Sequence, residues 1–286
     1  MMASMRALLH RSLKSCQRRA FVGVTGPHST RPDHLTRTAA EPRDDLIADA
    51  QIVSVRSITP TVRELDLRLP ENCGFCFRAG NWVDFFIPEV KTVGGYSICS
   101  IPGDLPQMRL AVKASTHPPA AWCHEKAAPG MSVRVKAGGS FYFDAKEHRE
   151  LQCLVLVAGG IGINPPYAIL QEVLAHTSLM PNLRRVALLY SAATSSELAY
   201  RTHLEALAGQ DARVVLDFRV TRGPWQGDSR RIDADAVAAA VDDGGGIAGA
   251  IVYICGPPAM TDELVEGLGP GGRGFPEGRV RCEKWW

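Results

Sequence analysis

Two glycine-bearing segments contain the residues best suited to chemistry. The first follows an apolar run and leads into a helical pattern; it reads Gly159-Gly160-Ile161-Gly162-Ile163-Asn164-Pro165. Glycines let the backbone turn tightly and approach a ligand, and free amides at a helix start attract a diphosphate. We expect Asn164 to cap the helix and Pro165 to lie in its first turn. The spacing is not the Rossmann pattern, so the segment predicts either a dinucleotide-binding loop or a tight structural turn.

The second segment places a thiol at the end of another strand pattern. Cys255 ends an apolar run and is followed by Gly256, Pro257 and a helical pattern. Because the carboxyl ends of parallel strands share one edge, we expect Cys255 and Gly160 on the same rim, where open α/β sheets bind ligands. The alternative for a free cysteine is a buried, small apolar residue. A third strand pattern ends in a carboxylate and two aromatic residues: Glu283, Trp285 and Trp286.

Two halves of different periodicity must position these residues. Residues 46–147 form short alternating segments separated by glycine and proline, a pattern typical of an antiparallel barrel. Residues 150–286 repeat strand, helix and strand, which predicts a doubly wound parallel sheet with helices on both faces. We expect the boundary near residues 144–150. One predicted helix is opened by Thr194 and Glu197 in capping-box spacing and runs to Leu207.

The N-terminal segment has the composition of a targeting signal. Residues 1–32 contain five arginines, Lys14 and no acidic residue, and Arg11, Lys14 and Arg18 would fall on one side of a helix. We therefore predict that residues 1–40 are a mitochondrial transit peptide and linker, that the protein resides in the matrix, and that the fold begins near Leu46. The alternative is a solvated tail.

The composition of the remaining chain excludes several classes of protein. Its 286 residues hold 32 Lys+Arg and 30 Asp+Glu, and the surplus positive charge lies in the first segment, so we expect no nucleic-acid surface. No apolar run is uninterrupted for the length of a membrane span, so we expect no transmembrane segment. The eight cysteines lack the spacing of a disulfide scaffold, a zinc site or an iron–sulfur cluster, so no metal site is predicted.

These segments, behind a barrel that carries Gly95-Tyr96-Ser97-Ile98-Cys99-Ser100, resemble the ferredoxin–NADP reductase superfamily over residues 49–286. The resemblance implies a flavin-binding barrel, a nicotinamide-nucleotide domain and hydride transfer between NAD(H) and FAD. It implies catalytic roles for Ser97, Cys255 and Glu283. It implies nucleotide contacts from the loop residues Gly159, Gly160, Ile161, Gly162, Ile163, Asn164 and Pro165, with Gly256 and Pro257, and flavin contacts from Tyr96, Ser97 and Trp286.

The sequence also departs from what the resemblance implies. The family arginine two residues before Tyr96 is Gly94, and a family hydroxyl that holds the flavin phosphates falls in Pro118–Ala121. Two charge-assisted hydrogen bonds are then missing, each worth about 1.5–3 kcal/mol. Three basic side chains are candidates to replace them: Lys113, His117 and His124. FAD is therefore a less certain cofactor than NAD.

Two functions remain open at this stage. The first is a flavin-dependent oxidoreductase that takes hydride from NADH and passes electrons to an unidentified acceptor, which could be another protein. The second is a flavin-free regulatory module that binds NAD(H) without turnover. NAD is favoured over NADP because the segment from Tyr190 to Glu197 offers hydroxyl groups and no Arg or Lys for a 2′-phosphate; Ser191 and Arg222 are the candidates for the opposite preference.

Overall fold

The computed structural model describes residues 33–284. The predicted transit peptide in residues 1–32, together with Trp285 and Trp286, lies outside the described residues. The strands are β1 Ala48–Thr59, β2 Val62–Arg68, β3 Trp82–Phe86, β4 Gly94–Ser97, β5 Gln107–Lys113, β6 Ser132–Gly138, β7 Cys153–Gly159, β8 Arg185–Ala192, β9 Val214–Val220, β10 Ala250–Cys255 and β11 Val280–Glu283. The α-helices are α2 His34–Arg37, α3 Pro118–Glu125, α4 Asn164–Ala175, α5 Arg201–Gln210, α6 Ala234–Asp242 and α7 Pro258–Leu268.

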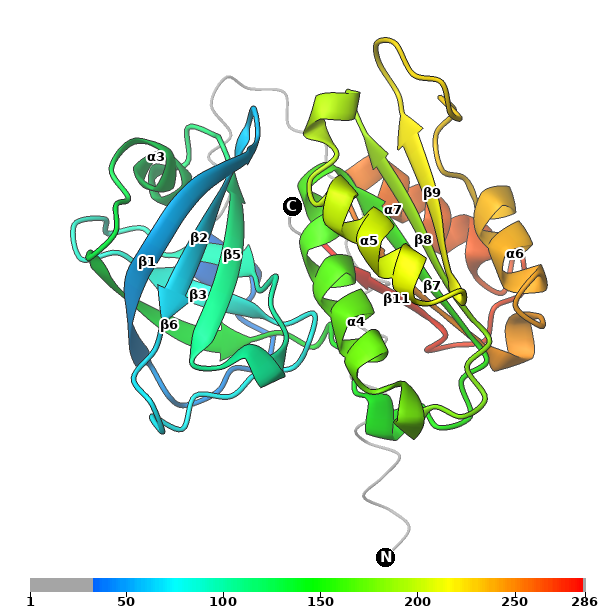
Figure 1. Cartoon of the computed structure of the whole chain (residues 1–286), viewed down its shortest axis with the longest axis horizontal. Helices are drawn as coiled ribbons and strands as arrows, with labels where there is room; N and C mark the ends of the chain where they lie inside the picture. Colours follow the sequence, from blue (N-terminus) through cyan, green and yellow to red (C-terminus); the bar gives the residue numbers. More distant parts are fainter. Residues whose placement is uncertain (1–32, 285–286) are drawn as a thin grey trace, which may run out of the picture. The chain divides into compact units, whose positions relative to one another are not determined.

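The first six strands form the predicted antiparallel barrel (Figure 1). Their order is β4-β3-β6-β1-β2-β5, and every neighbouring pair is antiparallel. An isolated bridge between Ile98 and Leu110 joins the two edge strands and closes the sheet. The first residues of β1 alternate between buried and exposed, as one face of an antiparallel strand requires.

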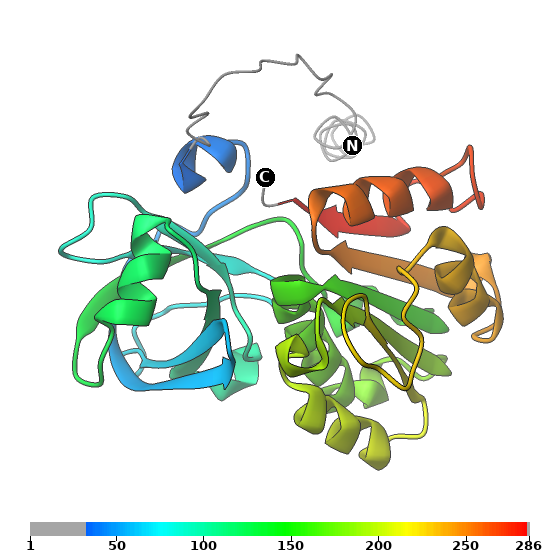
Figure 2. The ribbon, with the colours of Figure 1, turned by 90° about the horizontal axis from the view of Figure 1, so that it is seen from above.

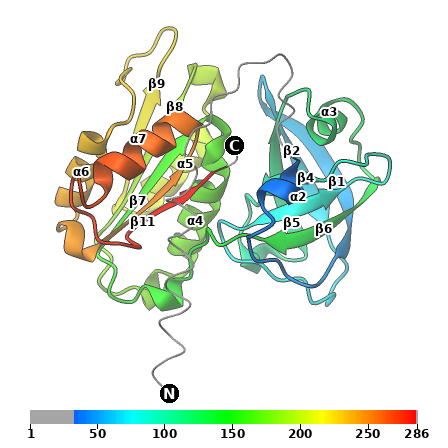
Figure 3. The ribbon, with the colours of Figure 1, turned by 180° about the vertical axis from the view of Figure 1, so that it is seen from behind.

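The last five strands form the predicted parallel sheet, in the order β11-β10-β7-β8-β9. Leu154 and Leu156 of β7 join the apolar cluster that contains α4 and α5, while Val155 and Val157 join the cluster of α6 and α7. Figure 1 shows α4 and α5 in front of the sheet, and Figure 3 shows α6 and α7 in front of it from behind. Covering both faces explains why β7 is an unbroken apolar run.

The chain order creates a switch point in this sheet. After β7 the chain adds β8 and β9 on one side, then crosses back to add β10 and β11 on the other. Helices that leave β7 and β10 therefore lie on opposite faces, and the switch point lies between the carboxyl ends of these two strands. Ligands of open α/β sheets bind at such a point.

The fold begins earlier than the predicted Leu46, because residues 33–43 pack against the barrel; we call them the N-terminal strap. His34 of α2 is 1% exposed, and its Nε2 lies 2.7 Å from Oδ1 of Asp84. The Arg43 guanidinium also contacts Asp84, at 2.8 Å, and lies over the Trp82 ring. Figure 2 shows α2 as a dark blue helix beside the barrel strands. Residues 33–40 are therefore part of the folded unit rather than a linker.

The predicted capping box at Thr194 and Glu197 is wrong. Residues Ser195–Glu197 form a 3-10 turn, and α5 begins only at Arg201, after Tyr200 in the left-handed conformation. Thr194 makes no cap hydrogen bond, and the Glu197 carboxylate accepts hydrogen bonds from the barrel instead. A contact distant in sequence has replaced the local one.

One apolar cluster spans the barrel and the α4–α5 face of the parallel sheet, beside a second cluster within the barrel and a third on the α6–α7 face. Barrel residues such as Cys99, Ala111 and Phe143 belong to the same buried cluster as α4 and α5. Two hydrogen bonds also join the two halves of the fold. Gln171 Nε2 donates to the Cys99 carbonyl at 3.0 Å, and the Tyr253 hydroxyl donates to the Tyr142 carbonyl at 2.8 Å. No described helix is long and apolar enough to cross a membrane.

Candidate functional site

The two predicted loops meet at the switch point, as expected. Cys255 pairs in register with Ala158, so the turns that follow both strands are adjacent. A Cβ on Gly162 would stand 2.3 Å from the Cys255 carbonyl oxygen, and one on Gly159 would stand 2.5 Å from Pro257. Both glycines are therefore required because the loops pack against each other. The predicted common rim of Gly160 and Cys255 is confirmed.

Gly160 has a different role from its neighbours. Its φ is +54°, and a Cβ built on it would meet no atom within 4 Å. The open space at Gly160 and the partly exposed Ile161 belong to a cavity at the rim. Gly160 is thus the glycine of this loop that leaves room for a ligand, and its positive φ turns the chain into α4.

The predicted cap at Asn164 is wrong. Asn164 is the first residue of α4 and makes no cap bond; its Nδ2 donates to the Ala111 carbonyl of β5 at 2.9 Å. The side chains of Ile163, Asn164 and Pro165 are buried, so these residues would offer a ligand backbone groups alone, and Pro165 has no amide hydrogen. Among the side chains of this loop, Ile161 therefore remains the one exposed to the cavity.

The three predicted catalytic residues come together from both halves of the fold. Glu283 pairs in register with Cys255 across β10 and β11. The Ser97 hydroxyl, at the end of β4, donates to Glu283 Oε2 at 3.4 Å. Burial, and then the charge of Glu283, raise the pKa of the Cys255 thiol well above its ordinary value, so the thiol is neutral at pH 7. A hydroxyl, a thiol and a carboxylate thus form one buried cluster.

A small cavity lies between the Gly160 loop and the barrel. Parallel-sheet residues Gly160, Ile161, Tyr190, Ala192, Ala193, Glu197 and Ala199 line it, with Val62 and Lys113 of the barrel. Lys113 was predicted as a possible flavin-phosphate ligand, but the structure places it beside the dinucleotide loop. A cation there suits a nucleotide diphosphate. The strand pattern of β5 alone could not show which loop its last residue faces.

The residues at the expected flavin-diphosphate position do not fit the grip that the resemblance implies. A Cβ on Gly94 would stand 2.7 Å from the Tyr96 ring and 3.0 Å from Pro119, so Gly94 and the start of α3 are adjacent. Helix α3 begins with Pro118 and Pro119, which have no amide hydrogens to donate. Position 94 therefore supplies no side-chain donor, and the first two residues of α3 supply no amide donor.

The other predicted flavin contacts are also engaged elsewhere. The Tyr96 ring packs against the barrel cluster, at 5.6 Å from Phe85, and its hydroxyl is buried. His124 Nε2 lies 2.8 Å from the Val112 carbonyl. Burial, followed by the charges of Arg37 and His34, lowers the pKa of His117, which favours its neutral form. These side chains do not replace the missing phosphate ligands.

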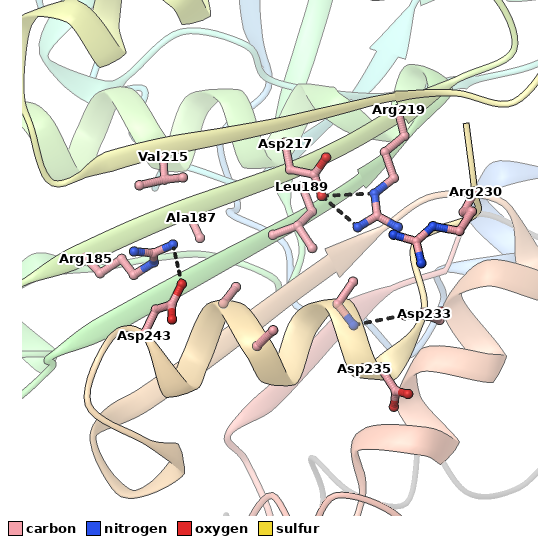
Figure 4. Close-up of a pocket in the computed structure, with 13 residues that line it drawn as sticks. Arg185, Ala187, Leu189, Val215, Asp217, Arg219, Arg230, Asp233, Asp235 and Asp243 are labelled. Carbon is pink, nitrogen blue, oxygen red and sulfur yellow. Dashed lines mark hydrogen bonds and ion pairs between the residues drawn. The ribbon is translucent and has the colours of Figure 1, made fainter. Parts of the chain in front are cut away.

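A larger cavity lies away from this chemistry (Figure 4). It has a volume of about 400 Å³ and lies between α6 and strands β8 and β9. Its floor carries Ala187 and Leu189, and its arginines are paired with acids: Arg185 lies 3.1 Å from Asp243, and Arg219 lies 2.8 Å from Asp217. The predicted residues lie instead at the smaller cavity and beside it, so size does not identify the functional site.

Comparison with known proteins gives relatives over most of the chain. The family described as the oxidoreductase NAD-binding domain matches residues 156–266. The Danio rerio protein called oxidoreductase NAD-binding domain-containing protein 1 is 38% identical over 90% of this chain and 98% of its own length. The Homo sapiens protein of the same name is 35% identical over 89% of this chain and 85% of its own length. The ferredoxin–NADP reductase B of Sorangium cellulosum is 29% identical over 83% of this chain and 97% of its own length.

Solved structures share the fold. A ferredoxin–NADP+ reductase from Neisseria gonorrhoeae with bound FAD and NADP superposes with a TM-score of 0.68 at 18% identity, over 85% of this chain and 100% of that one. The cytochrome b5 reductase domain of Ulva prolifera nitrate reductase gives a TM-score of 0.64 at 22% identity, over 83% of this chain and 97% of that one.

Proposed function

This chain belongs to the oxidoreductase NAD-binding domain-containing protein 1 family, within the ferredoxin–NADP reductase superfamily of NAD(P)H oxidoreductases, and from that premise we propose that it is an NADH-dependent oxidoreductase. The dinucleotide would lie along the carboxyl edge of the sheet, with its diphosphate at the Gly160 turn. Its nicotinamide end would lie toward Cys255 and Glu283. The meeting of Ser97, Cys255 and Glu283 beside an open glycine turn is the observation that carries the proposal.

The described residues fit the parts of a dinucleotide. The backbone at Gly160 is open and precedes helix α4, whose positive end favours a diphosphate, and Lys113 lines the same cavity. When bound, NADH supplies a hydride. The neutral Cys255 thiol packs without charge beside the site, while the Glu283 carboxylate stabilises positive charge and holds the Ser97 hydroxyl in one orientation. These groups position a ring and exclude water from it.

FAD remains the proposed hydride acceptor of the first hypothesis, but tight binding of FAD is not supported. Gly94 provides no guanidinium, and Pro118 and Pro119 provide no amide donors, for its diphosphate. This misfit favours a second candidate function, the regulatory module that binds NAD(H) without a resident flavin. The two candidates share the dinucleotide site and differ in turnover.

One experiment tests both candidates on the full chain. The purified protein is examined by absorption spectroscopy and titrated with NADH while the fluorescence of NADH is followed. A yellow protein that NADH bleaches supports the flavin-dependent enzyme. A colourless protein that binds NADH supports the regulatory module if ferricyanide yields no NADH oxidation, and an oxidoreductase without resident flavin if it does. Absence of NADH binding would contradict the proposed function in either form.

We also propose that the protein is imported into the mitochondrial matrix. The support is the charge pattern of residues 1–32, which contain six basic and no acidic residues. The test compares import into isolated mitochondria of two chains: the full chain, and a variant in which the five arginines of residues 1–32 are replaced by glutamine. Equal import of the two chains would contradict the proposal.

A further inference from the structure

The cavity at the Gly160 turn contains one carboxylate, that of Glu197. Glu197 ends the 3-10 turn that follows β8, on the side of the Gly160 loop away from Cys255. If a dinucleotide lies with its nicotinamide end toward β10 and β11, its adenosine half extends toward β8. Glu197 then stands where the adenosine ribose would lie.

The Glu197 carboxylate is held by hydroxyl groups of the barrel. Its Oε2 accepts a hydrogen bond from Thr61 Oγ1 at 2.6 Å and another from Thr59 Oγ1 at 3.1 Å. Thr59 ends β1, and Thr61 lies in the turn before β2. The tip of the β1–β2 hairpin is thus fastened across one side of the cavity by two hydroxyl-to-carboxylate hydrogen bonds.

The turn that presents Glu197 is fixed from several directions. The Tyr190 hydroxyl donates to the Glu197 carbonyl at 3.3 Å and accepts from the Ala199 amide at 3.0 Å. Tyr200 adopts a φ of +62°, a conformation that costs a non-glycine residue free energy, and its ring stacks on Tyr167 at 4.0 Å. The position of Glu197 is therefore set by the fold and not by a flexible loop.

The cavity is closed to a dinucleotide in this arrangement. Its volume of about 40 Å³ holds a few water molecules at most. The two halves of the fold share a buried core, so they do not separate as rigid bodies at low cost. Opening the cavity therefore requires the hairpin tip to move, and that movement breaks the hydrogen bonds from Thr59 and Thr61 to Glu197.

We propose that Glu197 selects NAD over NADP, by exchanging the hydroxyl groups of Thr59 and Thr61 for the ribose hydroxyls of the incoming dinucleotide. The inference rests on the proposed NAD(H) site. A ribose diol offers a carboxylate the same donors as two threonines do, so the exchange preserves the hydrogen bonds of a half-buried charge. A 2′-phosphate offers Glu197 a second negative charge and no such donor, so NADP is repelled.

The test measures the Kd of NADH and of NADPH for the full chain by fluorescence titration. The wild-type chain is compared with Glu197→Gln and with the double variant Thr59→Val, Thr61→Val. Glu205→Gln is the matched control, because Glu205 lies on α5, pairs with Arg201 and does not line the cavity. Thermal unfolding of each variant reports whether the fold is retained.

The wild-type chain is expected to bind NADH more tightly than NADPH. Glu197→Gln should reduce the ratio of the two Kd values by about tenfold or more, since a charge-assisted hydrogen bond contributes at least one order of magnitude in affinity. The threonine double variant should bind NADH a few-fold more tightly at an unchanged ratio, because the competing donors are gone. Glu205→Gln should change neither Kd.

Three results would overturn the inference. An unchanged ratio in Glu197→Gln, with both substitutions lowering the unfolding temperature equally, would reduce Glu197 to a structural link between hairpin and sheet. A wild-type preference for NADPH would reverse the assigned selectivity. If neither nucleotide binds, the proposed function is refuted together with this inference. If both bind, and Glu197→Gln leaves the ratio of their Kd values unchanged, this inference alone is refuted.

Discussion

Gly162 and Cys255 are in direct backbone contact, although they are 93 positions apart in sequence: a Cβ on Gly162 would stand 2.3 Å from the Cys255 carbonyl oxygen. The contact joins the turn after β7 to the turn after β10 at the switch point of the sheet. The nucleotide loop and the thiol therefore cannot move independently. The glycine signature of this loop reflects packing at Gly162 and open space at Gly160.

Alanine at these two glycines should have different effects. Gly162→Ala forces the two backbones apart and should destabilise the protein by about 2–4 kcal/mol, as overpacking against backbone does. Gly160→Ala meets no atom but strains a positive φ, at about 1–2 kcal/mol, and places a methyl group in the cavity, so NADH binding should weaken more than stability does. Urea unfolding and NADH titration measure the two effects. Equal losses of stability in the two variants would argue against the assignment.

Cys255→Ala should slow NADH oxidation at least tenfold while the Kd of NADH changes less than about threefold. The thiol is buried and neutral, and it lies beside Glu283; in the proposed function it packs against the nicotinamide ring and does not hold the diphosphate. NADH oxidation is followed with ferricyanide as acceptor, with and without added FAD. Cys76→Ala, at an exposed position of the barrel, is the control. Parallel losses in rate and affinity would contradict this placement of the thiol.

His34→Ala should destabilise the barrel by about 2–4 kcal/mol, because it removes a buried ring and a hydrogen bond to a buried carboxylate. Burial alone would raise the pKa of Asp84, but hydrogen bonds from His34 and Arg43 outweigh it and hold that pKa below its usual value. Leu35→Ala, at an exposed site on the same helix, should cost less than about 0.5 kcal/mol. Urea unfolding midpoints compare the two variants, and equal midpoints would show that the strap adds no stability.

Stability should fall in acid through His148. Burial, and then the charges of Arg281 and Arg279, lower the pKa of His148 from 6.5 to about 4. The folded protein therefore holds the neutral ring, so this contribution is complete above about pH 6.5 and is lost as the pH falls toward 4. Solvent screening limits the loss to the order of 1 kcal/mol. Replacement of His148 by Phe should flatten the unfolding free energy between these pH values, and an unchanged slope would exclude His148 as its cause.

The alternation of apolar residues was enough to predict both sheets. Strands β7 and β10 are unbroken apolar runs because helices cover both faces of the parallel sheet. The barrel strands alternate because only one face of their sheet is buried. The rim of Gly160 and Cys255 followed from the rule that parallel strands end on one edge. These features depend on local pattern and on a general rule of topology.

The failures share a cause, which is contact between residues far apart in sequence. Asn164 and Glu197 both stand where local capping is favourable, yet the barrel takes their side chains through Ala111, Thr59 and Thr61. His34 lies in a segment of linker-like composition, and the space it fills exists because residue 95 lacks a side chain. No local pattern in the sequence reports such pairings.

The contacts of His34 and Arg43 with the barrel also limit how many N-terminal residues the folded protein can lose. Removal of residues 34–43 would leave the buried Asp84 carboxylate without its contacts to His34 and Arg43, and would uncover the Trp82 ring. Any removal of N-terminal residues would therefore have to stop before His34, because that residue is held by a carboxylate fifty positions further along the chain.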